Sequence, residues 1–132
     1  MKILYKYSEL KVATIINRPS KEVKSPYLAD IKFKDSDQVL MAHSPALGLC
    51  GFIRSGSKVA LSEKFDCKNV KRKSKYTIEL VEIENDDKKK LWVGANPCLS
   101  NNLFEIMINK NIIDFIDSVK VLKREYQYEI NN

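Results

Sequence analysis

Apolar and polar residues alternate with a period of two along most of residues 1–95, a spacing typical of half-buried β-strands. The alternation is clearest where Tyr27, Ala29, Ile31 and Phe33 fall on one face of the chain and Lys32 falls on the other. The same pattern predicts further strands near residues 10–16, 39–42, 58–62, 76–84 and 91–95. This part of the chain is therefore expected to be mainly β.

The predicted strand at residues 76–84 changes phase in its middle. Ile78 and Leu80 have one parity, whereas Val81 and Ile83 have the other. An extra residue in the strand, a β-bulge, returns both pairs to the same face of a sheet. The sequence therefore predicts a bulge near Leu80.

The segment between the third and fourth predicted strands, residues 45–56, is too long for a tight hairpin and has room for one short helix between glycines. Three strands, a short helix and two more strands is the order of an OB-fold barrel, an architecture that commonly binds oligonucleotides. We therefore predict a mainly β protein in which residues 1–96 form a five-stranded OB-fold barrel.

After Pro97 the spacing becomes helical, and either Asn101 or Asn102 is a suitable cap for a helix. Two apolar faces of that helix are formed by Leu103, Ile106 and Met107 on one side and by Phe104 and Ile108 on the other. A second short helix at residues 112–116 and a strand at 119–130 are predicted to follow. Because two apolar faces need cover on both sides, the helix-strand appendage at residues 97–132 predicts a homodimer or partner contact through residues 101–130.

Positive charge is concentrated in the middle of the chain. The net charge of the chain is +6, and residues 54–75 alone carry eight basic side chains against Glu63 and Asp66. A local excess of this kind is the footprint of a protein that binds a phosphate backbone. It is equally what a solubilising surface provides.

Several other classes of protein are disfavoured. No apolar run approaches the roughly 20 residues of a membrane helix, and residues 1–6 lack the apolar core of a signal peptide, so we expect a cytoplasmic protein with no membrane partner. Cys50, Cys67 and Cys98 are odd in number and widely spaced, unlike a disulfide framework or a zinc knuckle. We expect no metal and no cofactor.

Two aromatic residues and the single histidine are the remaining candidates for chemistry. Trp92 is either a core residue or a stacking platform, and its place in an apolar strand favours the core. Tyr76 follows Lys73 and Lys75 and is better placed to stack on a base. His43 has no sequence partners for a catalytic triad or a zinc site, so we expect it to hydrogen-bond the backbone of its own loop.

Four stretches of the chain together resemble the SfsA (sugar fermentation stimulation protein A) family. They are Ala42-His43-Ser44-Pro45 with Gly48, Gly51 and residues 56–62; residues 72–82, which begin Arg72-Lys73-Ser74-Lys75-Tyr76; Trp92-Val93-Gly94-Ala95-Asn96 with Asn101 and residues 103–105; and Arg124-Glu125-Tyr126-Gln127-Tyr128. Their order and approximate spacing match the family patterns over about residues 27–128. Ala46 and Cys50 depart from those patterns, standing where the family has Asn and roughly where it has Met.

The resemblance implies an amino-terminal OB-fold followed by a second domain related to restriction-type nucleases. The acidic and lysine positions of that second domain come later in the family pattern than Asn132, where this sequence stops. Glu105 and Glu125 match family positions but are too few to build a magnesium site. The resemblance therefore implies nuclease ancestry, with no catalytic residue and no enzyme activity expected here.

The predicted function is non-sequence-specific binding of DNA or RNA by neutralising backbone phosphates. The residues expected to make these contacts are Arg18, Lys21, Lys24, Arg54, Lys58, Arg72, Lys73, Lys75 and Tyr76. One alternative is an interaction module that pairs through residues 101–130 with a second copy or with a nuclease-like partner. Another is an intact nuclease with an unorthodox site, which the missing acidic positions disfavour.

Overall fold

A computed structural model describes residues 3–63, 74–116, 119–120 and 122–123. The chain divides into two compact units. One consists of Tyr7–Pro97, and the other joins Met1–Lys6 to Cys98–Asn132. Each unit is described by itself below.

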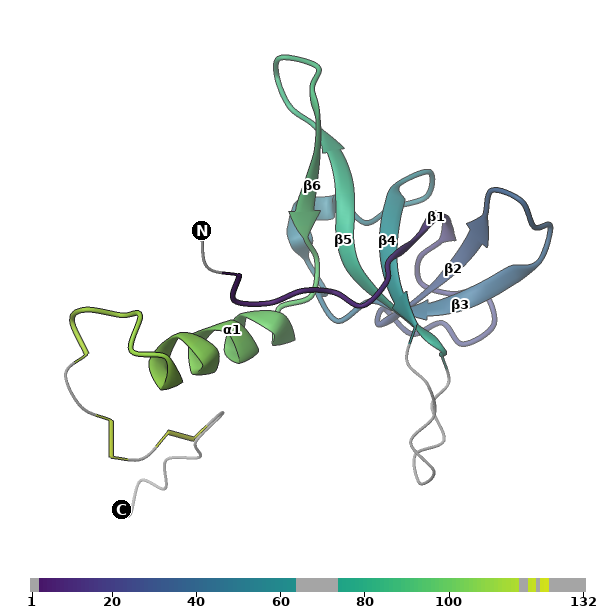
Figure 1. Ribbon diagram of the computed structural model, residues 1–132. Coiled ribbons are helices and arrows are strands. Elements are labelled where there is room, and N and C mark those ends of the chain that lie inside the picture. The colour runs from purple at the N-terminus through teal and green to yellow at the C-terminus, as the bar shows by residue number, and fades with distance from the viewer. Residues whose placement is uncertain (1–2, 64–73, 117–118, 121, 124–132) are drawn as a thin grey trace, which may run out of the picture. The chain divides into compact units, whose positions relative to one another are not determined.

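The larger unit is a ring of β-strands (Figure 1). Its strands are β1 (Lys11–Asn17), β2 (Leu28–Phe33), β3 (Val39–His43), β4 (Lys58–Glu63), β5 (Tyr76–Glu84) and β6 (Lys90–Gly94). They lie in the order β3-β2-β1-β4-β5-β6, and a parallel pairing of β3 with β5 closes the ring. The predicted mainly β, OB-like barrel is therefore confirmed, and the strand expected near residues 91–95 is β6, which pairs with β5.

The barrel interior is filled by the apolar residues that the period of two places on one face of each strand. Ile15, Ile31, Leu61 and Ile78 are all fully buried in one core cluster. The short helix expected between the third and fourth strands is a single 3-10 turn, Leu49–Gly51. Apolar burial on this scale is the main force that holds a small barrel together.

The bulge predicted in β5 is present. Ala60 of β4 pairs with Leu80, the next residue Leu61 pairs with Ile78, and the register shifts between them. Glu79 is therefore the extra residue on β5. Because of it, Ile78 and Val81 both point into the core despite their different parity.

The smaller unit contains one helix, α1 (Cys98–Asn109), in which no residue is fully buried. It begins before Asn101, so the predicted cap at Asn101 or Asn102 is wrong. It ends where Asn111 adopts a left-handed φ of 49° while the amide of Ile112 donates to the carbonyl of Met107 at 3.0 Å, a Schellman ending.

Beyond α1 the structure differs from the sequence prediction in one place and leaves another open. Residues 112–116 are irregular apart from a turn at 114–115 and do not form a second helix, since the left-handed Asn111 ends the helical path. Most of the strand predicted at 119–130 lies outside the described residues.

No helix in the described part of the chain is long and apolar enough to cross a membrane.

Candidate nucleic-acid interface

The loop between β1 and β2, residues 18–27, is fastened by Arg18. The guanidinium of Arg18 donates to the carbonyls of Pro26 at 3.1 Å, Ala46 at 2.6 Å and Leu47 at 3.2 Å. Burial lowers the pKa of Arg18. Its donors thus hold this loop against the chain that follows β3. The geometry gives Arg18 a positioning task, and its predicted contact with phosphate stays a prediction.

Asp30 of β2 also holds this loop in place through hydrogen bonds. Its carboxylate is only 6% exposed and accepts hydrogen bonds from the Lys21 amide at 3.0 Å and the Asn17 side chain at 3.3 Å. Burial by itself raises the pKa of Asp30, but hydrogen bonds from Ser20, Lys21 and Asn17 outweigh it and leave the pKa lowered. The loop therefore presents the exposed side chains of Lys21 and Lys24 from a fixed backbone.

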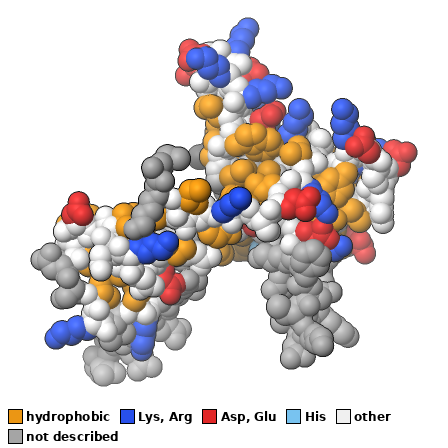
Figure 2. Space-filling view, viewed as in Figure 1, with side chains coloured by type: hydrophobic (Ala, Val, Ile, Leu, Met, Phe, Trp, Pro, Cys, Tyr) orange, Lys and Arg blue, Asp and Glu red, His pale blue; other side chains and the backbone are white. Residues whose placement is uncertain are grey.

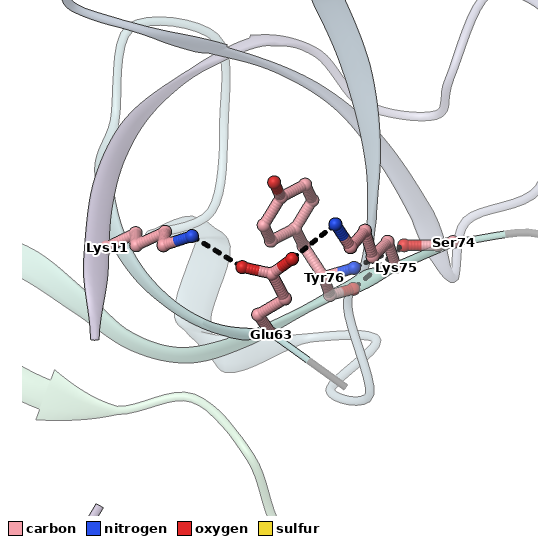
Figure 3. Close-up of polar contacts among 5 residues, drawn as sticks. All are labelled: Lys11, Glu63, Ser74, Lys75 and Tyr76. Atoms are coloured by element: carbon pink, nitrogen blue, oxygen red, sulfur yellow. Dashed lines mark hydrogen bonds and ion pairs between the residues drawn. The ribbon is translucent and has the colours of Figure 1, made fainter. Parts of the chain in front are cut away.

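Glu63, the last residue of β4, forms ion pairs with two lysines (Figure 3). Its carboxylate pairs with Lys11 of β1 on one oxygen and with Lys75 on the other. The hydrogen bonds from Lys11 and Lys75 lower the pKa of Glu63, and the same contacts raise the pKa of each lysine. Lys75, a predicted phosphate contact, therefore shares a carboxylate with Lys11, and the three groups together carry one net positive charge.

Tyr76 begins β5 beside this cluster. Its ring is half-buried and meets Phe33 edge to face, with 5.4 Å between centroids and an interplanar angle of 71°. The hydroxyl of Ser74 accepts from the Tyr76 amide at 3.3 Å and donates to the Met41 carbonyl at 2.9 Å. Tyr76 is thus held against the barrel with its side chain partly exposed.

Arg54 and Lys58 lie elsewhere on the barrel. Lys58 begins β4, whereas Glu63 ends it, and a strand rises about 3.3 Å per residue, so the two positions are roughly 16 Å apart. Arg54 and Lys58 line a groove with Glu82, Glu84 and other residues. Of the predicted contacts that the structure describes, Lys58 and Lys75 therefore lie near opposite ends of β4, and on the face shown in Figure 2 basic and acidic side chains are interspersed.

Two of the predicted contacts, Arg72 and Lys73, lie outside the described residues. They belong to residues 64–73, which join β4 to β5. In OB-folds the ligand lies on the face of the second and third strands, between the loop joining strands one and two and the loop joining strands four and five. Lys21 and Lys24 are in the first of these loops, and Lys75 and Tyr76 end the second.

Some residues near these positions were missed or misjudged from the sequence. Lys11 was not singled out, although it has the same parity as the buried Ala13 and Ile15; its side chain is 40% exposed and pairs with Glu63. Trp92 was expected in the core, but its side chain is 44% exposed on β6. His43 ends β3 and is exposed, and its expected hydrogen bond to the backbone of its own loop stays a prediction. The surroundings of these residues depend on where their strands lie in the folded barrel. Period-two spacing along one strand does not predict this.

The two acidic residues matched to the nuclease pattern lie in different parts of the chain. Glu105 lies in α1 and Glu125 lies outside the described residues. In the described ranges no group of three or more His, Cys, Asp or Glu side chains is arranged to hold a metal ion.

Comparison with known proteins gives one consistent relationship. No protein-family model matches the chain. Sugar fermentation stimulation protein homologues are 33% identical in Trichodesmium erythraeum and 30% in Nostoc, each over 97% of the chain and 47% and 49% of the relative. A Prochlorococcus marinus homologue is 34% identical over 77% of the chain and 41% of its own length. The chain spans about half the length of these relatives.

A solved structure shares the fold. The Pyrococcus furiosus SfsA structure, determined in complex with Ca2+, superposes with a TM-score of 0.69 over 96% of this chain and 48% of that one, at 17% sequence identity. Identity at this level speaks for the fold alone. The relatives and the shared fold agree with the four motifs found in the sequence. Over the half of these proteins that it matches, the chain is SfsA-like in both sequence and fold.

Proposed function

We propose that this SfsA-like chain is a nucleic-acid-binding module of the OB type that contacts the phosphate backbone without reading sequence. The observation that carries the proposal is the closed OB ring with basic residues in both loops that flank its ligand face. Lys21 and Lys24 stand on the loop after β1, and Lys75 stands at the start of β5. The proposal places the protein in the cytosol and assigns no catalytic residue.

The proposed mechanism is neutralisation of phosphates with release of counterions. Lys21 and Lys24 are exposed on a loop that Arg18 and Asp30 hold in place, so little ordering is required when they meet a ligand. Arg72 and Lys73, which lie in the sequence between β4 and β5, are proposed to add further phosphate contacts. The partly exposed Tyr76 ring is proposed to add a surface for one base.

A charge-matched pair of variants tests this surface. In the first, Arg72, Lys73 and Lys75 are each replaced by Ala. In the control, three exposed basic residues that belong to neither loop, Lys34, Lys89 and Lys110, are replaced in the same way. Fluorescence anisotropy with labelled single-stranded DNA, duplex DNA and RNA compares their affinities.

The first variant is expected to bind more weakly and with a shallower salt dependence. Its log–log slope should fall by about 0.7 to 0.9 for each phosphate that the protein no longer neutralises. The control is expected to stay close to wild type. Equally weakened binding in both variants would show that affinity follows net charge alone, and the proposed surface would be wrong.

A second function, interaction through residues 101–130, is supported by α1. The helix is rich in apolar residues, yet none of its side chains is fully buried, and Phe104 is 48% exposed. Apolar surface of this kind on a helix is typical of a contact with another protein. We propose that a second copy of the chain covers it, and the oligomeric state in solution tests this.

A further inference from the structure

A groove on the barrel lies between the turn that precedes β4 and the β5–β6 hairpin. We call it the hairpin groove. It has a volume of about 520 Å3, within the range of sites for small molecules. The charged and aromatic side chains that line it are Phe52, Arg54, Lys58, Glu82, Glu84 and Lys90.

The wall formed by residues 52–58 is braced from both sides. The Ser57 hydroxyl donates to the Phe52 carbonyl at 2.7 Å and accepts from the Arg54 amide at 3.1 Å. Gly56, at a left-handed φ of 87°, donates its amide to the Ile15 carbonyl at 2.8 Å, and the Ile15 amide donates back to the Ser57 carbonyl at 2.9 Å. The groove is therefore formed before any ligand arrives, which keeps the entropic cost of binding low.

Three cations converge on the groove and keep donors available. The Glu82 carboxylate lies 3.9 Å from the Lys58 ammonium and 3.8 Å from the Lys90 ammonium, beyond hydrogen-bond length. Arg54 is exposed, and the described residues give its guanidinium no hydrogen-bond or ion-pair partner. A guanidinium beside two ammonium groups is the donor set that recognises a phosphate.

An aromatic ring and two carboxylates lie beside these cations. Phe52 is 41% exposed, whereas the next residue, Ile53, is 4% exposed. An exposed ring next to a guanidinium is a surface on which a base stacks. The carboxylates of Glu82 and Glu84 accept hydrogen bonds from the exocyclic amine of a base or from ribose hydroxyls, groups that inorganic phosphate lacks.

The same carboxylates limit how much phosphate the groove accepts. A continuous strand carries a negative charge at every phosphate, and Glu82 and Glu84 oppose a second one. From this combination we propose that the hairpin groove binds a nucleoside monophosphate, either free or as the phosphorylated end of a strand. This site is separate from the loop surface of the proposed function and does not rest on it.

NMR chemical-shift mapping on the 15N-labelled full chain tests the site. The probes are the nucleoside monophosphates, inorganic phosphate, and a short oligonucleotide with and without a 5′-phosphate. Monophosphates are expected to shift amides in residues 52–58, 82–84 and 90. The Arg54→Ala variant should weaken their binding at least about tenfold, whereas the exposed control Lys34→Ala should not. Phe52→Leu should weaken the monophosphates and leave inorganic phosphate unchanged.

The oligonucleotides identify the source of the ligand. Tighter binding of the 5′-phosphorylated oligonucleotide at these amides assigns strand ends, and tighter binding of the free monophosphates assigns a free nucleotide; either supports the site. Equal affinity for inorganic phosphate and the monophosphates would overturn it, as would shifts confined to residues 18–27 and 74–76. The latter result would leave the loop surface standing, so the two proposals fail separately.

Discussion

Asp30 and Glu63 are carboxylates that folding holds in their charged form. Asp30 accepts hydrogen bonds from the loop after β1, and Glu63 pairs with Lys11 and Lys75 at the end of β4. Both have a lowered pKa. At the scale of single residues, these two groups determine how the neighbouring basic side chains are presented, and each gives a test.

The substitution Asp30→Asn is expected to destabilise the fold in a pH-dependent way. The folded pKa of Asp30 lies below that of an unfolded aspartate, about 3.9. Its stabilisation is therefore complete above that pH and disappears as the pH falls through the folded pKa. Urea unfolding should show a clear difference between wild type and variant at neutral pH and a much smaller one near pH 3. The same difference at both pH values would contradict this role.

The substitution Glu63→Gln is expected to tighten nucleic-acid binding, by at most about fivefold. It removes the carboxylate that Lys11 and Lys75 share, so the positive charges of both ammonium groups are no longer offset when a phosphate binds. The matched control is Asp87→Asn, which removes one negative charge from the exposed β5–β6 hairpin. Anisotropy at a fixed salt concentration compares the two, and an equal effect would mean that only net charge matters.

Single side chains show where prediction from sequence stops. The presence of basic residues in the first loop was evident, but the task of Arg18 was not, because its partners are the carbonyls of Ala46 and Leu47, distant in the chain. The shared partner of Lys11 and Lys75 was likewise hidden. Hydrogen bonds between loops form only when the ring of strands closes. The spacing of residues along one strand carries no information about that closure.

At the scale of elements, the period and phase of the apolar residues predicted the strands and the bulge. The candidate helix caps did not predict where α1 begins. The phase change between Ile78 and Val81 predicted the bulge that the β4–β5 register shows. The helix boundary was misjudged because Asn101 is a good cap only where no earlier turn forms, and α1 already begins at Cys98. Its end at Asn111 is a left-handed turn that asparagine adopts readily.

The proposed self-association through α1 is tested by Phe104→Glu. This residue is among the exposed apolar side chains of the helix, and a buried unpaired carboxylate at an interface is strongly unfavourable. Light scattering across a concentration series should show a dimer for wild type and a monomer for the variant. Asn109→Glu, an exposed polar position on the same helix, is the control. A monomer for wild type at high concentration would exclude the dimer.

At the scale of the whole chain, the order of the elements predicted the architecture. Three strands, a helical turn and two strands close through the β3–β5 pairing, as an OB ring requires. The position of the sixth strand was not predictable from order, because β6 joins the edge of β5 and stays outside the ring. The basic residues of the segment 54–75 are close together in the sequence. In the fold they are divided between the two ends of β4 and the segment between β4 and β5.

The most direct test of backbone binding is the affinity of the wild-type chain for labelled DNA across a salt series. If six phosphates of duplex DNA are neutralised, the logarithm of the binding constant should fall with the logarithm of salt concentration at a slope near −5, at roughly 0.9 per phosphate. A steep slope that is similar for unrelated sequences is the expected result. Affinity that hardly changes with salt, or no binding at low salt, would contradict the central claim that this OB-like barrel is a phosphate-backbone binder.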